Sequence, residues 1–284
     1  MDPDAFGSLA GFYRILKNIG GYTLKATNDE LPPESFGFLN SSHIIEPDLD
    51  IKKFQPDLII SFDASSIDQL GNQYRQYEKT FANTEFVVID HHISNPGFGK
   101  LNLINTDASS TCEIVWHIIE TLGLEQYVDR QIATLLTTGL LTDTNIYYNA
   151  NTTGDTLRTG AKLLDNDADF RLPMFEFYKK KEFYKSKLWG EVLRNLEREQ
   201  YMTSPQPSPS KREGDTYIYW SIITSEMFAA TETSDVDVSG LINEFLANLE
   251  GMEVCFLLYP LPDGKIKASL RSNSFDVSEL CQSF

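Results

Sequence analysis

Residues 86–92 read FVVIDHH, and this stretch decides the fold. Its first four residues form a short apolar run, which predicts a buried β-strand followed by polar residues. The run at 57–62 reads DLIISF and ends in the same way at Asp63. In an open parallel sheet, ligands bind beyond the carboxyl ends of the strands. We therefore expect Asp63, Asp90 and the two histidines after Asp90 to meet in one crevice.

Helices are expected on either side of these strands. The stretch from Ser8 to Ile19 is amphipathic and ends at a glycine pair, which predicts a helix with Asp2 and Asp4 just before it. Ser110 to Glu113 has the form of a capping box ahead of an apolar stretch, and 156–164 is a further helical segment. Short apolar runs that alternate with amphipathic helices indicate an α/β domain with a largely parallel sheet.

The second half of the chain predicts a smaller α/β domain. A long connecting helix is expected from Phe175 to Arg198. Residues 204–214 read SPQPSPSKREG, which breaks all periodicity and is typical of a disordered loop or an inserted linker. A helical segment near 238–249 and three apolar runs complete this domain, the runs being 216–220, 254–259 and 266–270. The predicted division is a domain at 1–172, a connecting helix and flexible linker at 173–215, and a second domain at 216–284.

Composition narrows the possible partners and the compartment. A net charge of -17 over 284 residues argues against a broad basic surface that grips long double-stranded nucleic acid, although a short phosphorylated substrate is compatible with it. Three widely spaced cysteines support neither a disulfide framework nor a thiol-rich zinc site, which favours a reducing cytoplasm. No signal-peptide pattern and no apolar run of membrane-spanning length is present. We expect a soluble cytoplasmic protein with no membrane partner.

Several carboxylates are candidates for one metal site. An apolar stretch through Leu140-Leu141, interpreted as a third strand, places another acid at a strand exit. A single acid after a strand is more often a turn or helix-cap residue, but here the pattern recurs. Converging carboxylates repel one another unless cations neutralise them, and oxygen ligands with one or two imidazoles suit Mn²⁺ or Mg²⁺. The candidates are Asp2, Asp4, Asp63, Asp90 and Asp143.

Two of the four histidines are consecutive, at His91 and His92. Consecutive side chains project in different directions, so their roles should differ. A carboxylate that bridges two ions roughly 3.5 to 4 Å apart would allow activation of a water and stabilise charge on phosphoryl oxygens. Hydrolysis of a phosphate ester is therefore the expected chemistry.

The ordered set of motifs resembles the DHH phosphoesterase superfamily. Asp90-His91-His92 follows an apolar strand, with DPDAFGS at 2–8 upstream, Asp63 between them and Thr142-Asp143-Thr144 downstream. The segment from Ser269 to Ser272 is similar to the DHH-associated C-terminal domain of the nanoRNase and pAp-phosphatase (NrnA-like) group. The likeness spans nearly the whole chain, and the order of the motifs is more specific than the three letters DHH.

The resemblance implies roles for individual residues. His92 would contact the scissile phosphate and Asp90 would orient an imidazole, which makes these two the catalytic pair. Arg271, with Ser272 beside it, would bind a terminal phosphate of the substrate. The remaining family positions are metal ligands, with Asp63 bridging: Asp2, Asp4, Asp63, His91 and Asp143.

The activity implied is that of a manganese-dependent phosphoesterase and exoribonuclease. It would use a metal-activated water on short oligonucleotides, on 3'-phosphoadenosine 5'-phosphate, or on both. A family II inorganic pyrophosphatase and a cyclic-dinucleotide phosphodiesterase are alternative enzymes. A noncatalytic nucleotide-binding remnant is an alternative of a different class, and a homodimer is left open.

Two family features do not occur in this sequence. The family's first motif usually contains a histidine, and a strand before it, upstream of the position of Asp2. NrnA-like chains usually continue from a segment like 276–280 into a glycine-rich, histidine-containing loop. We therefore expect an incomplete first metal site and a truncated second domain in the chain as written.

Overall fold

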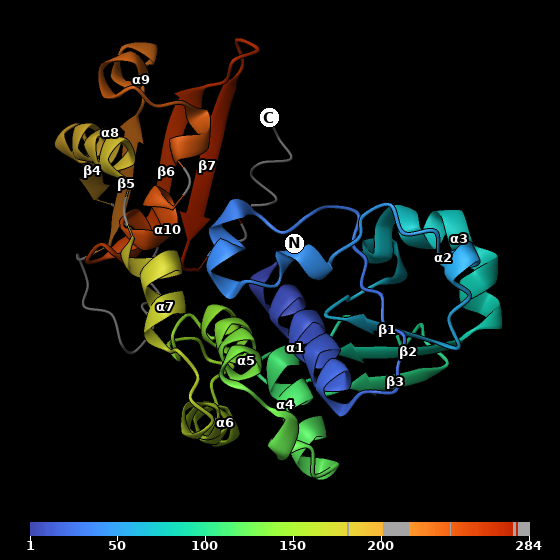
Figure 1. Ribbon diagram of the computed structural model, residues 1–284. Coiled ribbons are helices and arrows are strands. Elements are labelled where there is room, and N and C mark those ends of the chain that lie inside the picture. Colours follow the sequence, from blue (N-terminus) through green and yellow to red (C-terminus); the bar gives the residue numbers. More distant parts are fainter. Residues whose placement is uncertain (181, 201–215, 239, 275–276, 278–284) are drawn as a thin grey trace. The chain divides into compact units, whose positions relative to one another are not determined.

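The computed structural model describes residues 1–180, 182–200, 216–238, 240–274 and 277 (Figure 1). The chain divides into two compact units, Met1–Lys180 and Lys181–Phe284. Each unit is described by itself. The expected linker at 204–214 lies outside the described residues, and the boundaries at 172 and 215 stay predictions.

The first unit is built on a three-stranded parallel sheet, in the order β1-β2-β3. These strands are β1 (Leu58–Phe62), β2 (Glu85–Asp90) and β3 (Leu101–Ile104). The strands predicted from 57–62 and 86–89 are confirmed. Phe62 pairs with Ile89, so β1 and β2 end at the same edge of the sheet. This register brings the segments that follow the two strands together.

Helices cover both faces of this sheet. Phe86 and Val88 of β2 pack with Phe81 of α3 (Gly71–Asn83) and Ile51 of α2 (Ile51–Phe54). Ile89 faces the opposite way and packs against Ile114 of α4 (Thr111–Thr121). Successive residues of a strand point to opposite faces of the sheet. The continuous apolar run of β2 therefore packs against helices on both faces.

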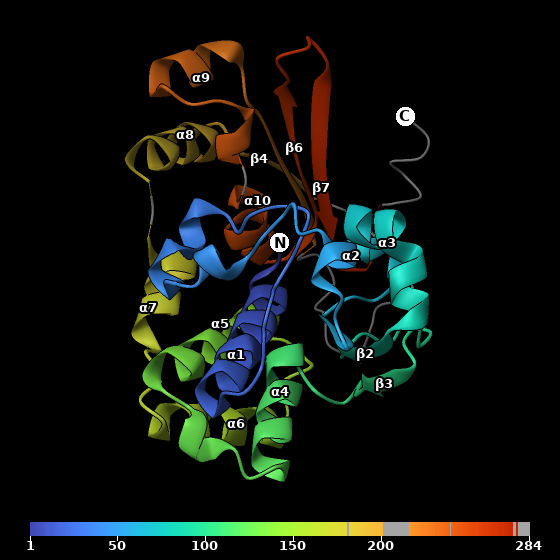
Figure 2. The ribbon, with the colours of Figure 1, turned by 45° about the vertical axis from the view of Figure 1, so that its right-hand side comes forward.

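A second core lies among the helices. Views in Figures 1 and 2 agree that α1 (Pro3–Ile19) lies along α4 and α5 (Arg130–Asp143). Ile15, Trp116 and Leu136 are almost completely buried there, with Leu163 of α6 (Gly154–Asp165). Full burial of each such side chain contributes roughly 1.5–3 kcal/mol. Short helical segments make the remaining connections: η1 (Glu34–Leu39), η2 (Ser42–Ile44), η3 (Ile67–Leu70), η4 (Glu125–Tyr127), α7 (Arg171–Pro173) and η5 (Met174–Lys179).

Two expectations about this unit were wrong. The helix expected from Ser8 starts at Pro3, so Asp2 is its N-cap and Asp4 lies in its first turn. The stretch through Leu140-Leu141 belongs to α5 and is not a strand, so Asp143 ends a helix. The residues from Ile132 to Leu141 are all buried. A helix buried on all sides has the continuous apolar pattern of a buried strand, and periodicity alone does not separate the two.

Close contact between α1 and α5 depends on Gly139. A Cβ atom added there would overlap Asp4 Oδ1 and Cys112 Sγ. Gly139→Ala is therefore expected to lower the free energy of unfolding by about 1–3 kcal/mol, since an overpacked core must shift. Denaturant unfolding followed by circular dichroism measures this change. Gly37→Ala, where no heavy atom lies within 4 Å of the added carbon, is the control and should leave stability nearly unchanged. Equal stability of the two variants would contradict the packing described.

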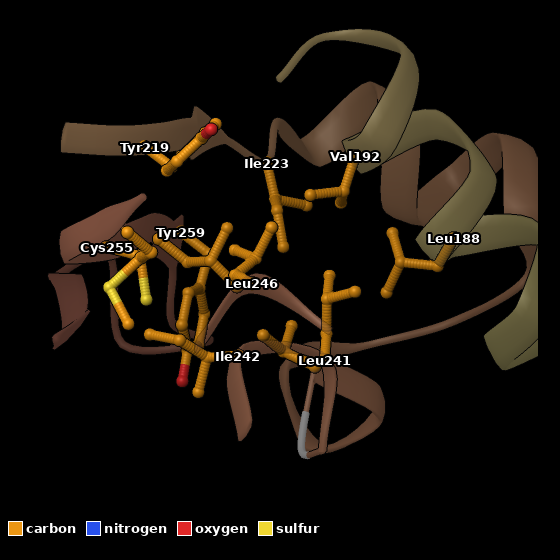
Figure 3. Close-up of a cluster of buried hydrophobic side chains, with 12 residues drawn as sticks. Leu188, Val192, Tyr219, Ile223, Leu241, Ile242, Leu246, Cys255 and Tyr259 are labelled. Atoms are coloured by element: carbon orange, nitrogen blue, oxygen red, sulfur yellow. The ribbon is translucent and has the colours of Figure 1, made fainter. Parts of the chain in front are cut away.

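The second unit contains a mixed four-stranded sheet in the order β4-β5-β6-β7. Its strands are β4 (Glu197–Gln200), β5 (Tyr217–Ile222), β6 (Met252–Pro260) and β7 (Ile266–Ser272). The β5–β6 pair is parallel and the two outer pairs are antiparallel. Figure 3 shows its core, in which Leu188 and Val192 of α8 (Phe183–Arg194) approach Ile223 and Leu241. A smaller α/β domain is thus confirmed.

Two helical segments of this half differ from the expected ones. The helix predicted from Phe175 to Arg198 is interrupted, since Lys180 and Glu182 have extended backbone and Glu197 already belongs to β4. Among the described residues of 238–249, separate short segments take the place of one helix. The short elements of this region are α9 (Ser225–Thr231), η6 (Asp235–Val238), α10 (Leu241–Glu244) and η7 (Leu246–Asn248).

Candidate metal centre

Asp63 follows β1 directly, at the edge of the sheet where β2 also ends. Its backbone N–H donates to the Ile89 carbonyl at 3.0 Å, and its φ of 55° is left-handed. Aspartate is one of the few residues that adopt this conformation readily. The Thr111 hydroxyl donates to Asp63 Oδ1 at 3.0 Å. Both the backbone and the carboxylate of Asp63 are thereby held in place.

Asp4 lies fully buried against the N-terminus of α4. Its two carboxylate oxygens accept from the backbone N–H groups of Thr111, at 2.7 Å, and Cys112, at 2.9 Å. A helix N-terminus has unpaired N–H groups and a partial positive charge, which offset part of the cost of burying a carboxylate. The first turn of α1 is thus tied to the first turn of α4.

Asp90, also fully buried, orients the dipeptide that follows it. Its Oδ1 accepts from the His91 backbone N–H at 2.9 Å and lies 2.7 Å from His92 Nδ1. Because a carboxylate oxygen only accepts, Nδ1 of His92 carries a proton, and Nε2 is left for another partner. Asn95 Nδ2 donates to the other oxygen of Asp90 at 2.6 Å.

His91 lies between two carboxylates. Its Nε2 atom is 3.1 Å from Asp143 Oδ2 and 3.6 Å from Asp63 Oδ1. The same atom is buried and makes no hydrogen bond of acceptable geometry. His92 Nδ1 lies 3.6 Å from Asp63 Oδ1, and the two imidazole rings are 4.4 Å apart. The structure therefore brings together six of the predicted side chains: Asp4, Asp63, Asp90, His91, His92 and Asp143.

The carboxylates at this centre have raised pKa values. Burial raises the pKa of Asp4 to about 6, and Asp143 raises it as well. Burial and Asp4 raise the pKa of Asp63 to about 7, and burial also raises the pKa of Asp143. For His91, burial lowers the pKa but the surrounding aspartates outweigh it and raise the value to about 9. The centre concentrates negative charge, which a cation would neutralise.

The donor set fits a divalent metal. Two groups of side chains have ligand atoms within 4.8 Å of one another: Asp63, His91 and His92, and Asp4, His91 and Asp143. Carboxylate oxygens and imidazole nitrogens are ligands of Mn²⁺ and Mg²⁺, and the unbonded Nε2 of His91 is an atom that an ion would satisfy. Among the described residues, no lysine or arginine bonds to these aspartates.

Asp143 is held by an unusual turn at the end of α5. Asn145, Ile146 and Tyr147 are consecutive residues with left-handed backbone. For a β-branched residue such as Ile146 this conformation is strained. Asn149 Nδ2 donates to the Asp143 carbonyl at 3.0 Å and Asn151 Nδ2 does so at 3.3 Å. This segment contains no glycine, so its residue types do not predict such a turn.

Other predicted site residues lie outside these two groups. Asp2 is an exposed N-cap whose Oδ1 accepts from the Asp4 backbone N–H at 2.8 Å. Arg271 and Ser272 lie on β7 of the second unit, where Arg271 Nε donates to Asn243 Oδ1 at 2.7 Å. A metal-ligand role for Asp2, and substrate-binding roles for Arg271 and Ser272, stay predictions.

Asp90→Asn tests the orienting contact. Asparagine has only one acceptor oxygen and no charge, so it cannot accept from both His92 Nδ1 and Asn95 Nδ2, and the imidazole should be held less firmly. Loss of such a supporting partner typically lowers metal affinity or activity 10–100-fold. Titration with Mn²⁺ and a pH–rate profile would measure the change. Asp107→Asn, at an exposed position in a loop, should behave as the parent protein does. An Asp90→Asn variant with unaltered affinity and rate would disprove the orienting role.

The fold and the site define a class of protein. It is an α/β protein whose parallel sheet carries a carboxylate–imidazole centre, suited to divalent ions, beyond its strand ends. Residues 1–140 match the model of the DHH family, N-terminal domain, and this part of the chain belongs to that family.

Curated relatives agree with this assignment. The chain is 33% identical over 166 residues to the bifunctional oligoribonuclease and PAP phosphatase NrnA of Thermus thermophilus, which covers 57% of this chain and 46% of that protein. It is 26% identical over 286 residues to the probable bifunctional oligoribonuclease and PAP phosphatase NrnA of Streptococcus mutans, covering 99% and 81%. The first match thus spans less than half of the Thermus protein.

A solved structure shares the fold. The exopolyphosphatase-related protein from Bacteroides fragilis superposes with a TM-score of 0.79 at 20% identity, over 100% of this chain and 80% of that one. The expected α/β fold, with a parallel-sheet domain and a smaller α/β domain, is confirmed by this likeness. Separately, no helix within the described ranges is long and apolar enough to cross a membrane.

Proposed function

We propose that this protein is a phosphoesterase that depends on a divalent metal, with Mn²⁺ as the preferred ion. Its proposed substrates are short oligonucleotides, 3'-phosphoadenosine 5'-phosphate, or both. The observation that carries the proposal is the buried Nε2 atom of His91, which has no hydrogen-bond partner and belongs to both groups of candidate ligand atoms. The printed names of the Thermus and Streptococcus relatives support the substrate class.

The protein's charge supports a metal-dependent route. A substrate phosphate is anionic, and the protein is negative too, with a net charge of -17 and a site rich in carboxylates. The two would repel each other without a cation between them. When bound, divalent ions would neutralise phosphoryl oxygens and lower the pKa of a water molecule. Asp4, Asp63, His91 and Asp143 would hold such ions.

His92 is the residue proposed to meet the substrate. Its side chain is 42% exposed, whereas the side chain of His91 is 14% exposed. Asp90 engages Nδ1, so the Nε2 edge of the ring is available to the scissile phosphate. In the proposed reaction the imidazole contacts a phosphoryl oxygen, and Asp90 stabilises the positive charge when the ring is protonated.

Metal binding is expected to depend on pH. Asp4, Asp63 and His91 have raised pKa values of about 6, 7 and 9, so the metal-free protein holds protons that an ion must displace. Affinity for Mn²⁺ should therefore rise between about pH 6 and pH 8, with release of protons. These raised values favour the folded state at low pH, and that contribution is lost as pH rises through them.

Thermal unfolding at several pH values, with and without Mn²⁺, measures this linkage. The melting temperature of the metal-free protein should fall as pH rises from about 6 to 8. Mn²⁺ at 100 times its Kd should add about 2.7 kcal/mol of stability. Mn²⁺ affinity that falls as pH rises would contradict the protonation pattern.

A substrate panel tests the proposed activity directly. The protein is incubated with a dinucleotide, with 3'-phosphoadenosine 5'-phosphate and with inorganic pyrophosphate, each with Mn²⁺, with Mg²⁺ or with a chelator. We expect hydrolysis of one or both nucleotides with Mn²⁺ and none with the chelator. Hydrolysis of pyrophosphate alone would show an inorganic pyrophosphatase. No hydrolysis under any condition would overturn the proposed activity.

A further inference from the structure

Glu113 is a buried carboxylate in the first turn of α4 and is no part of the metal groups. It is 1% exposed. Its Oε2 atom accepts from Ser109 N at 2.8 Å, from Ser109 Oγ at 2.6 Å and from Thr156 Oγ1 at 3.1 Å. Ser109 and Thr156 are themselves fully buried. Burying a carboxylate costs free energy unless hydrogen bonds satisfy it. The three hydrogen bonds to Oε2 therefore hold Ser109 and Thr156 in fixed positions.

The segment that Glu113 holds leads directly to two candidate metal ligands. Ser109 precedes Ser110, the N-cap of α4, whose hydroxyl accepts from the Glu113 backbone N–H at 3.1 Å. The next two residues supply the N–H groups that bind Asp4, and Thr111 also donates to Asp63. A shift of the Ser109–Ser110 link would therefore move the donors of both carboxylates.

Glu113 is also linked to Asp143, the third acidic candidate ligand, through Ser109 and Asn151. The Ser109 carbonyl accepts from Asn151 Nδ2 at 3.0 Å, and that amide group also lies 3.3 Å from the Asp143 carbonyl. Thr156, the third donor to Glu113, lies in the first turn of α6 and bonds to the Thr153 cap. One oxygen atom thus links the start of α4, the start of α6 and the turn after α5.

We propose that Glu113 is a positioning residue that sets the spacing of Asp4, Asp63 and Asp143 for metal binding. This inference rests on the proposed function in one respect, namely that the centre binds a divalent ion. Glu113 does not touch the ion or the substrate. Without its carboxylate, Ser109 N–H and the hydroxyls of Ser109 and Thr156 lose their shared acceptor in a buried site, and the N-terminus of α4 loses its anchor.

Two variants of Glu113 and one matched control test the proposal. Glu113→Ala removes the acceptor, whereas Glu113→Gln keeps an amide oxygen that can accept from the same donors. Ile119→Val is the control, because it removes one methylene from a fully buried position in the C-terminal half of the same helix. Each protein is titrated with Mn²⁺ by electron paramagnetic resonance. Amide hydrogen exchange at Thr111 and Cys112 is measured in the absence of metal.

Glu113→Ala is expected to weaken Mn²⁺ binding 10–100-fold and to accelerate exchange at the two amides that bind Asp4. Glu113→Gln should restore most of both properties, and Ile119→Val should keep the affinity of the parent protein. Should Glu113→Ala fail to fold, Ser109→Ala removes only the 2.6 Å hydroxyl contact and should change both readouts in the same direction.

The outcomes separate this inference from the proposed function. Unchanged affinity and unchanged exchange in Glu113→Ala, or an equal loss in Ile119→Val, would overturn the positioning role. Failure of the parent protein to bind Mn²⁺ would overturn the metal-dependent function. The exchange measurement, which needs no metal, would still decide whether Glu113 fixes the start of α4.

Discussion

Asp63→Asn is expected to lower kcat/KM more than about 10³-fold, which corresponds to about 4 kcal/mol. The Oδ1 atom of Asp63 lies 3.6 Å from a nitrogen of His91 and 3.6 Å from a nitrogen of His92. It is therefore the carboxylate that joins the two imidazoles. Asparagine keeps the size and tolerates the left-handed backbone at this position. It removes the charge, so the loss should arise from the metal site and not from misfolding.

Steady-state kinetics with a dinucleotide, together with Mn²⁺ titration, measures this effect. Asp68→Asn is a suitable control, since Asp68 is exposed and lies in η3 only a few residues away. Its kinetics and affinity should match those of the parent protein. Retention of more than a tenth of the parental kcat/KM by Asp63→Asn would be incompatible with a bridging role for this carboxylate.

His92→Ala is expected to lower kcat by about 10²–10⁴-fold while leaving most of the Mn²⁺ affinity intact. Asp90 already occupies Nδ1 of His92, which leaves the exposed edge of the ring for the substrate. The two consecutive histidines should therefore differ, because His91→Ala removes a side chain shared by both metal groups and should abolish tight Mn²⁺ binding.

The comparison of the two histidine variants distinguishes their roles. Both kinetic constants and the Mn²⁺ Kd are measured for each protein. His43→Ala, at an exposed position in η2, controls for the loss of an imidazole. If His92→Ala loses Mn²⁺ affinity as severely as His91→Ala does, His92 is a metal ligand and the proposed contact with the phosphate is wrong.

Much of the first sheet could be predicted from the amino-acid sequence. Residues 58–62 and 86–89 are short, apolar and followed by polar groups, and this local pattern is sufficient to identify buried parallel strands. The assignment of Asp143 to a strand exit failed because α5 is buried along most of its length, so it lacks a polar face. Its side chain reaches the centre from a helix end and not from a strand.

The main features of the candidate site were also predictable, whereas their support was not. Acids and histidines after two strands indicated where Asp63, His91 and His92 would meet. Contacts between remote segments have no such local pattern, and they include the N–H groups at the start of α4 that bind Asp4. A capping box also predicts that the Glu113 side chain accepts from the Ser110 backbone N–H. In the structure it accepts from the Ser109 backbone N–H instead.

The turn after Asp143 illustrates a second limit. Left-handed residues are usually recognised by glycine or asparagine, and here Ile146 and Tyr147 adopt this conformation next to Asn145. Hydrogen bonds hold the turn, and they include the Thr144 hydroxyl, which accepts from Tyr147 N at 3.0 Å. Residue preferences alone therefore predict a different backbone at this position.

The most direct measurement is Mn²⁺ binding by the purified parent protein, followed by electron paramagnetic resonance beside Asp63→Asn and Asp68→Asn. The account predicts that the parent protein and Asp68→Asn remove free Mn²⁺ from solution at pH 8 and that Asp63→Asn does not. If the parent protein leaves all Mn²⁺ free, or if Asp63→Asn binds it equally well, the aspartates and histidines at this sheet edge are not a metal centre.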